Sequence, residues 1–284
     1  MTKRIPLEDD WTDVLKKARR GMALDDGTHS EAELGLRSGL SSGEIAALEN
    51  GTLDEEKLPA LAATLGLDAE KLLRLAKAKF HPGNIPLPTG LEMFSTPWSD
   101  FEVHSYLLWD PLPASTPVPA AAFDTGSDAT EMLESVKQRG LALDLLLLTH
   151  GHGDHVFDLD RIVEKTGASA WIGEGEGIDG AHPFSAGKTF YVGTLRIETR
   201  PTWGHAKGGI TYVVHGLEKP VAIVGDAIFS GSMGGANHSY KACLETNLRE
   251  ILSLPPETIL CPGHGPLTTV ALELGNNPFF AGSF

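Results

Sequence analysis

The stretch "LLLLTHGHGDHV", residues 145–156, places three histidines and an aspartate within six positions directly after four leucines. The leucines predict a strand buried on both faces, because a short continuous apolar run suits the middle of a covered sheet. The polar residues then fall on the loop at the carboxyl end of that strand. Ligands bind at such strand ends in layered α/β folds. This stretch therefore predicts a buried sheet with a functional site at its edge.

The histidine spacing favours metal binding. His150 and His152 are two positions apart, so in an extended loop their rings project to the same side and can bind one cation. Asp154 and His155 follow where the chain enters a helix, and they can reach a second cation nearby. A purely structural role is disfavoured, because unpaired imidazoles beside buried leucines would cost desolvation energy.

Two complete coordination spheres need further donors, and three later segments supply them. His205 lies in "PTWGHAKGG", Asp226 ends the apolar run "VAIVGD", and His264 lies in "CPGHG". Each of these residues stands beside a glycine at the carboxyl end of a predicted strand. We therefore expect all three to meet the loop of residues 150–155 at one sheet edge.

Residues 81–90, "HPGNIPLPTG", divide the chain, because three prolines and two glycines can neither continue a helix nor sit inside a sheet. We predict domains at 1–82 and 83–284. After this boundary strands alternate with helices, which predicts sheets covered by helices on the outside. The predicted strands are 101–109, 118–124, 141–148, 168–172, 195–200, 210–215, 221–226 and 258–263, and the predicted helices lie near 127–140, 156–165 and 239–252.

Before the boundary the pattern is helical. Ser30 with Glu33, and Ser41 with Glu44, fit the capping box, in which side chains satisfy the free N–H groups of a helix's first turn. Leucines recur at three- and four-residue steps, which predicts a small bundle of about five helices.

Charge and composition exclude several classes of partner. The formal charge is −15, and residues 1–82 carry 12 Lys and Arg against 15 Asp and Glu, a net of −3. Nucleic acid is therefore a poor partner, since that affinity depends on basic residues. The charged start "MTKRIPLEDDW" has no apolar signal region, and no apolar run approaches the roughly 18 residues that span a bilayer. With only Cys243 and Cys261, we expect reduced thiols, a cytoplasmic protein and no membrane contact.

The segments "THGHGDH", "WGHAKGG", "GDAIFSGS" and "CPGHGPLTT" together resemble the successive motifs of the metallo-β-lactamase superfamily, nearest its glyoxalase II-like hydrolases. The resemblance extends over about residues 91–284. It implies an α/β fold, an αββα sandwich of two facing sheets, here preceded by the small all-α domain. By motif it implies that one metal is held by His150, His152 and His205, a second by Asp154, His155 and His264, and that Asp226 bridges them.

The same resemblance implies a metal-dependent hydrolase that uses hydroxide activated by two divalent ions. Zinc is expected, with iron or manganese as alternatives, since imidazole and carboxylate donors accept all three. Asp154 and Asp226 are the expected catalytic residues, Asp154 orienting the hydroxide. Asp124 in "FDTG" is expected to orient a ligand histidine. The favoured small-molecule substrate is a thioester, although "GSMGGANHSYK" replaces the "GRTD"-like stretch of those relatives, which disfavours glutathione.

Residues 10–79 resemble the helix-turn-helix domain of Cro/cI-type repressors, chiefly through "GLS" and "I-x-x-L-E-N-G". The helix expected to read DNA, "SSGEIAALE", offers Gly, Glu and Ala where base readers present Gln, Asn, Arg or Lys. We therefore expect a dimerising or partner-binding region, with a homodimer as the simplest case. Two alternative functions stay open, a mononuclear iron oxygenase resembling the persulfide dioxygenases, and a ligand-sensing transcription regulator.

Overall fold

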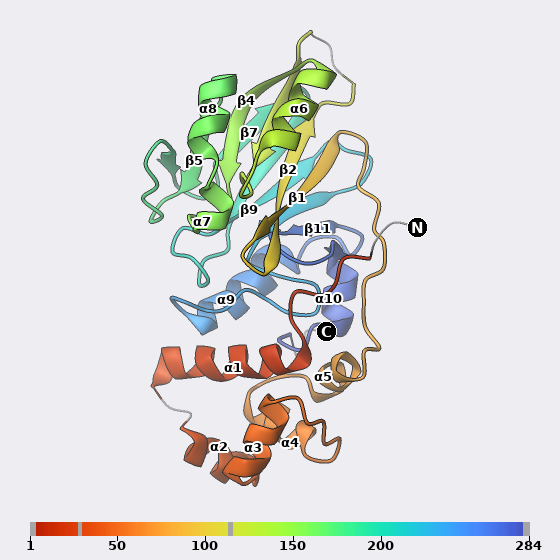
Figure 1. Cartoon of the computed structure of the whole chain (residues 1–284), viewed down its shortest axis with the longest axis vertical. Helices are drawn as coiled ribbons and strands as arrows, with labels where there is room; N and C mark the ends of the chain where they lie inside the picture. Colours follow the sequence, from red (N-terminus) through yellow and green to blue (C-terminus); the bar gives the residue numbers. More distant parts are fainter. Residues whose placement is uncertain (1–3, 28–29, 113–115, 281–284) are drawn as a thin grey trace.

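The structure is a computed structural model that describes residues 4–27, 30–112 and 116–280, so residues 1–3 of the charged start lie outside it. Two six-stranded sheets face each other, with helices on their outer faces (Figure 1). The strand order is β1-β2-β3-β4-β5-β6 in the first sheet and β12-β11-β10-β9-β8-β7 in the second. The predicted αββα sandwich with a helical region before it is confirmed.

Each sheet is formed by six strands that are consecutive in the sequence. The strands of the first sheet are β1 Leu91–Trp98, β2 Phe101–Trp109, β3 Val118–Phe123, β4 Leu141–Leu148, β5 Ser169–Gly173 and β6 His182–Phe184. Those of the second are β7 Thr189–Val192, β8 Leu195–Pro201, β9 Ile210–His215, β10 Val221–Gly225, β11 Ile259–Pro262 and β12 Thr268–Thr269.

The helices fall into an N-terminal group and a group that covers the sheets. The first group is α1 Trp11–Asp26, α2 Glu31–Ser38, α3 Ser42–Glu49, α4 Leu58–Thr64 and α5 Ala69–Ala76. The second is α6 Thr130–Arg139, α7 Gly153–Val156, α8 Leu159–Thr166, α9 Tyr240–Thr246 with a π-helical turn at Asn247–Ile251, and α10 Val270–Asn276.

Strand β4 lies between two hydrophobic layers. Leu147 packs into the layer between the sheets with Tyr212 of β9. Leu146 and Leu148 point the other way, into a layer with Ile162 of α8. Successive side chains of a strand face opposite sides, so an unbroken leucine run fills both layers. The prediction of a strand buried on both faces is confirmed.

Several short or edge elements were not predicted from the sequence. Strand β1 lies at the edge of the first sheet and pairs only with β2. Its sequence "LEMFSTPW" mixes polar residues with Pro97, which is tolerated at an edge because one side of the strand needs no ladder partner. Strands β6, β7 and β12 have two to four residues each, too few to show a period.

The N-terminal region forms the five predicted helices. Both capping boxes are present, with Ser30 and Glu33 at the start of α2 and Ser41 and Glu44 at the start of α3. Residues 81–90 contain no helix or strand and connect this region to β1. The leucines of α1–α5 nevertheless share one hydrophobic cluster with Val213 of β9 and other residues of the second sheet. The helical region therefore packs as part of the same body (Figure 1).

Two observations concern the chain's environment. No helix within the described ranges is long and apolar enough to cross a membrane. Cys243 and Cys261 are both buried, and they are not joined in a disulfide.

Polar contacts fix the helical region against the loop that follows β10. The Asp9 carboxylate pairs with the Lys17 ammonium and accepts a hydrogen bond of 2.6 Å from the Ser232 hydroxyl. Lys17 also donates to the carbonyl of Met233 at 2.9 Å. Asp9 is only 8% exposed, so these contacts replace water around a charged group.

We predict that Lys17→Met lowers the free energy of unfolding by about 1–3 kcal/mol, because Asp9 loses its cation and Met233 its donor while both stay buried. Urea titration of the purified variants measures this change. Arg20→Met on the same helix is the control, since Arg20 is exposed, and it should stay within about 0.5 kcal/mol of the wild type.

A buried carboxyl in α10 makes stability depend on pH. Glu273 is fully buried and accepts hydrogen bonds from Thr268, Asn277 and the N–H of Gly231. Burial raises its pKa to about 7, against an ordinary value of 4.5, and these hydrogen bonds offset only part of that rise. The folded protein therefore holds this proton more tightly than the unfolded chain does.

The folded state loses this advantage as pH rises from 4.5 through 7, so the free energy of unfolding should fall by on the order of 3 kcal/mol over that window. Glu273→Gln has no proton to lose, and its stability relative to the wild type should rise by that amount. Urea titrations at pH 4.5 and 7.5, with chelator present, measure the difference. Glu134→Gln, at an exposed position of α6, should show no such change.

Candidate metal centre

Four loops at one edge of the sandwich bring together all seven predicted side chains. The first follows β4, carries His150 and His152, and leads directly into helix α7 with Asp154 and His155. The others carry His205 between β8 and β9, Asp226 after β10, and His264 after β11. Strands β10 and β11 run parallel, so their carboxyl ends and the residues that follow lie side by side. The predicted convergence at one edge is what the structure shows.

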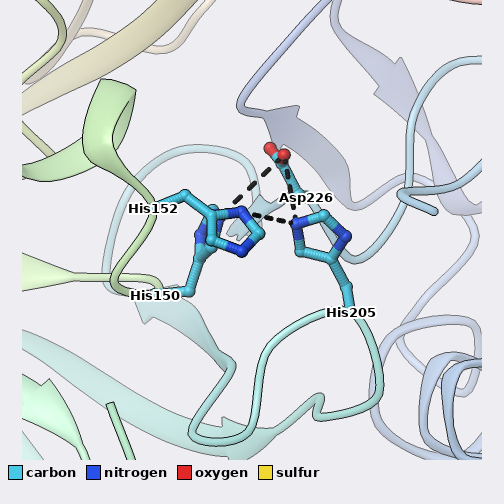
Figure 2. Close-up of side chains that lie close together, drawn as sticks. All are labelled: His150, His152, His205 and Asp226. Carbon is cyan, nitrogen blue, oxygen red and sulfur yellow. Dashed lines mark hydrogen bonds and ion pairs between the residues drawn. The ribbon is translucent and has the colours of Figure 1, made fainter. Parts of the chain in front are cut away.

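Three imidazoles and one carboxylate make a first group (Figure 2). His152 Nδ1 lies 3.0 Å from His150 Nε2 and 3.1 Å from His205 Nε2. Asp226 Oδ2 lies 3.9 Å from His150 Nε2 and 3.5 Å from His205 Nε2. Four donor atoms from three loops thus point at one small volume.

Asp154, His155 and His264 make a second group on the other side of Asp226. His264 Nε2 lies 3.3 Å from Asp154 Oδ2 and 3.4 Å from Asp226 Oδ2. His155 Nε2 lies 3.6 Å from Asp154 Oδ2 and 3.3 Å from Asp226 Oδ1. The two groups therefore share Asp226. Its Oδ2 lies within 4 Å of His150, His205 and His264, and its Oδ1 lies within 4 Å of His155.

The two groups differ in how burial and charge act on them. Burial, reinforced by the neighbouring His155, holds the pKa of His150 well below its ordinary value, so that ring is neutral. Burial also acts to lower the pKa of His155 and of His264. It is outweighed by the Asp226 carboxylate together with Asp124 for His155 and with Asp154 for His264, which raise the two pKa values to about 10 and about 11. For Asp226 itself, His264 and His155 overcome burial and hold the pKa well below 3.8. An ionised buried carboxylate thus lies at the centre and attracts positive charge.

The donor set fits divalent metal ions. In a tetrahedral zinc site with Zn–N of about 2.0–2.1 Å, neighbouring donors lie about 3.3 Å apart, close to the separations seen in both groups. His155 Nε2 and Asp226 Oδ1 are both buried and lie 3.3 Å apart, but the geometry between them is not that of a hydrogen bond. Neither atom forms a hydrogen bond with any other described residue. A Cβ at Gly263 would lie 2.3 Å from Asp226 Oδ1, so only glycine leaves this space open.

Hydrogen bonds on the far side of each ring fix its orientation. His205 Nδ1 donates to the carbonyl of Gly235 at 2.7 Å, and His264 Nδ1 donates to that of Glu102 at 2.8 Å. His155 Nδ1 donates to Asp124 Oδ2 at 2.8 Å. Each bond leaves Nε2 directed at the centre, an arrangement typical of metal-ligating histidines.

Asp124 also reaches the first group. Its carboxylate accepts from the backbone N–H and the hydroxyl of Thr149, both at 2.7 Å. The Thr149 oxygen lies 3.1 Å from His150 Nδ1 and can accept its proton. Asp124 therefore lies where the sequence placed it, against a histidine of the site.

Of the other aromatic and histidine residues, two tryptophans lie near the site and one histidine lies in the core. Trp98 lies against Gly153, and Trp203 is 44% exposed two positions before His205. His104 is fully buried between Ser95 and the carbonyl of Gly265, so it is a packing residue.

Sequence reasoning missed Phe101, Phe229 and Glu176. The rings of Phe101 and Phe229 meet His264 edge-on, with centroids 5.0 and 5.6 Å away. The Glu176 carboxylate accepts N–H groups from two of the histidine loops. No signal in the sequence separated these residues from other phenylalanines or from Glu174, because their roles come from contacts between distant segments.

The two-sheet sandwich with buried histidine and aspartate donors at its strand ends has the architecture of a metal-dependent hydrolase. The chain belongs to the metallo-beta-lactamase superfamily, whose sequence model matches residues 120–264, 145 of the 284 residues.

Two named relatives resemble the chain at modest identity. It is 29% identical over 187 residues to the probable metallo-hydrolase YqgX of Bacillus subtilis, covering 56% of this chain and 86% of that protein. It is 27% identical over 209 residues to the hydroxyacylglutathione hydrolase GloC of Haemophilus influenzae, covering 64% and 95%.

Solved structures show the same fold. ETHE1 from Myxococcus xanthus superposes with a TM-score of 0.58 at 25% identity, over 67% of this chain and 85% of that one. TTHA1623 in a di-iron-bound form superposes with a TM-score of 0.50 at 25% identity, over 66% and 99%.

We predict that Asp124→Asn weakens metal binding about 10–100-fold, because it removes the carboxylate that orients His155 and holds Thr149. Isothermal titration of the metal-free protein measures this affinity. Asp144→Asn on β4 is the control, since Asp144 is exposed, and it should bind metal as the wild type does. Equal affinities for both variants would contradict the orienting role.

Proposed function

We propose that the chain is a binuclear metal-dependent hydrolase that cleaves a thioester. The observation that carries this proposal is the position of Asp226 between two groups of donors. In our proposal the first ion is held by His150, His152 and His205, the second by Asp154, His155 and His264, and Asp226 bridges them.

When bound, two divalent cations supply Lewis acidity, which lowers the pKa of water from near 16 to about 7 and polarises a carbonyl. The chain's own residues position the reactants. Asp154 is 8% exposed and lies 3.3 Å from His264 Nε2, and its carboxylate would accept a hydrogen bond from the attacking water and orient it. A cysteine nucleophile is disfavoured, because burial raises the pKa of both Cys243 and Cys261.

Zinc is our first choice of metal, with iron or manganese as alternatives. Imidazole and carboxylate donors suit all three, so the donor set does not choose between them. The likeness to TTHA1623 in its di-iron-bound form supports two ions per chain and makes iron the stronger of the two alternatives.

A thioester substrate is supported by relatives named hydroxyacylglutathione hydrolase. Besides GloC, the enzyme of Brucella ovis is 31% identical over 166 residues, covering 57% of this chain and 61% of that protein. Thioester cleavage is chemically compatible with the site, because the acyl carbonyl needs only an activated water and stabilisation of the developing oxyanion.

The surroundings of His264 disfavour glutathione as the thiol. A cleft of about 630 Å³ lies between residues 5–8 and the hairpin tip at 97–102, and Phe101 on its wall contacts His264. Glu8, Asp100 and Glu102 line this cleft, and its described lining contains no Lys or Arg. Glutathione carries two carboxylates against one ammonium, so these acidic side chains would repel its net negative charge. We therefore propose a thiol that is neutral or cationic.

The oxygenase alternative uses less of the site. A mononuclear iron centre of two histidines and one carboxylate would need only His150, His205 and Asp226. It gives no role to His155 and His264, whose ring nitrogens both lie within 3.4 Å of Asp226. The hydrolase accounts for every donor.

For the helical region we propose a structural and interaction role rather than DNA reading. Helix α3 lies far from the sheets in Figure 1, and its acidic side chains are engaged within the region. Glu44 pairs with Lys57, and Glu49 pairs with Arg19. A homodimer through this region and a cytoplasmic location remain parts of the proposal.

Metal analysis joined to a thioester screen tests the proposal. The wild type should hold about two ions, while His205→Ala and His264→Ala should each hold about one and lose at least roughly a hundredfold in turnover. His182→Ala is the matched control, because His182 is exposed on β6, away from the centre. Hydroxyacylglutathione should be a poorer substrate than an uncharged thioester of the same acyl group.

Two results would contradict the proposal. A fully metallated preparation that cleaves no ester, thioester, lactam or phosphoester is not a hydrolase. Oxygen consumption with a glutathione persulfide, together with one iron per chain, would favour the oxygenase instead.

A further inference from the structure

Glu176 lies in the loop between β5 and β6 and makes two hydrogen bonds to backbone N–H groups. Its Oε2 accepts from Gly151 at 2.9 Å, and its Oε1 accepts from Gly208 at 2.5 Å. Both oxygens of one carboxylate are therefore engaged, each with a different loop. Hydrogen bonds to an ionised carboxylate are stronger than those between neutral groups.

The two donors belong to the loops that carry the first metal group. Gly151 lies between His150 and His152, and Gly208 lies three residues after His205. The histidine nitrogens of these loops meet at 3.0–3.1 Å. One side chain from a third segment thus joins the two loops beside the point where their ligands converge.

The packing around Glu176 is close. A Cβ at Gly151 would lie 2.8 Å from Glu176 Oε2, so the carboxylate can approach this backbone only because residue 151 is glycine. A Cβ at Gly208 would lie 2.4 Å from the carbonyl oxygen of Glu174, so that loop is held close as well. By contrast, the Glu174 side chain is exposed and forms no hydrogen bond within the described part of the chain.

We propose that Glu176 is a positioning residue of the first metal group, which sets the separation between the His150–His152 loop and the His205 loop. The rings of the second group are held by other acceptors, Asp124 for His155 and the carbonyl of Glu102 for His264. Glu176 therefore acts on one metal ion and not on the other. This inference rests on the two-metal part of the proposed function and not on the reaction.

Glu176→Gln tests the proposal with little change in volume. The amide oxygen can accept one N–H, but the amide nitrogen then faces the other N–H and loses that bond. Glu174→Gln, two residues away in the same loop, makes the same chemical change at an exposed side chain and is the matched control.

Metal affinity should be measured for each group separately, by titrating metal-free protein with Co²⁺ and following its visible absorption against a competing chelator. The His264→Ala background leaves the first group intact, and the His205→Ala background leaves the second. Glu176→Gln should weaken Co²⁺ binding about 10–100-fold in the first background and less than about threefold in the second. Glu174→Gln should change neither.

Three outcomes would overturn the proposal. Unchanged affinity in the His264→Ala background removes the role, and equal weakening in both backgrounds assigns Glu176 to the fold in general. If far-UV circular dichroism shows that the Glu176→Gln protein is unfolded without metal, Glu176 is likewise assigned to the fold in general. Because no substrate is used, a failure of the proposed hydrolysis would leave these affinities as expected, whereas a wild type that binds no cobalt would overturn both.

Discussion

The ionised carboxylate of Asp226, buried at the end of β10, is the constraint on which the rest of the site depends. A charge removed from water at this depth is stable only if positive groups surround it. Four histidines from three segments of the chain approach it within 3.3–3.9 Å. The negative charge that raises the pKa of His155 and His264 also favours divalent cations, so one residue links the fold, the charge balance and the chemistry.

This centre requires rigid loops, and the fold supplies that rigidity from outside the metal ligands. Asp124 fixes His155 and Thr149, and backbone carbonyls fix His205 and His264. Glu176 joins two loops whose strands belong to different sheets. Small displacements of ligands weaken metal binding strongly, which is why these supporting contacts matter as much as the donors.

The sequence and the packing of the helical region point to different roles. Its sequence resembles a DNA-binding module, but its leucines share a hydrophobic cluster with the second sheet. Asp9 and Lys17 hold the Ser232–Met233 turn, which follows Asp226 by six residues, and residues 5–8 form one wall of the cleft beside His264. Through these contacts the helical region supports the loop that follows Asp226 and borders the cleft beside His264.

The sequence alone determined the strand under the histidine loop, the capped helices and the seven donors, because these depend on local pattern and on short motifs at strand ends. The edge strands β1, β6, β7 and β12 escaped prediction because they are short or mixed in polarity. Only the tertiary structure decided that Glu176 and not Glu174 reaches the site, and that Phe101 faces His264. Those roles arise where segments distant in sequence meet, and local pattern carries no information about which of two similar side chains lies at the meeting point.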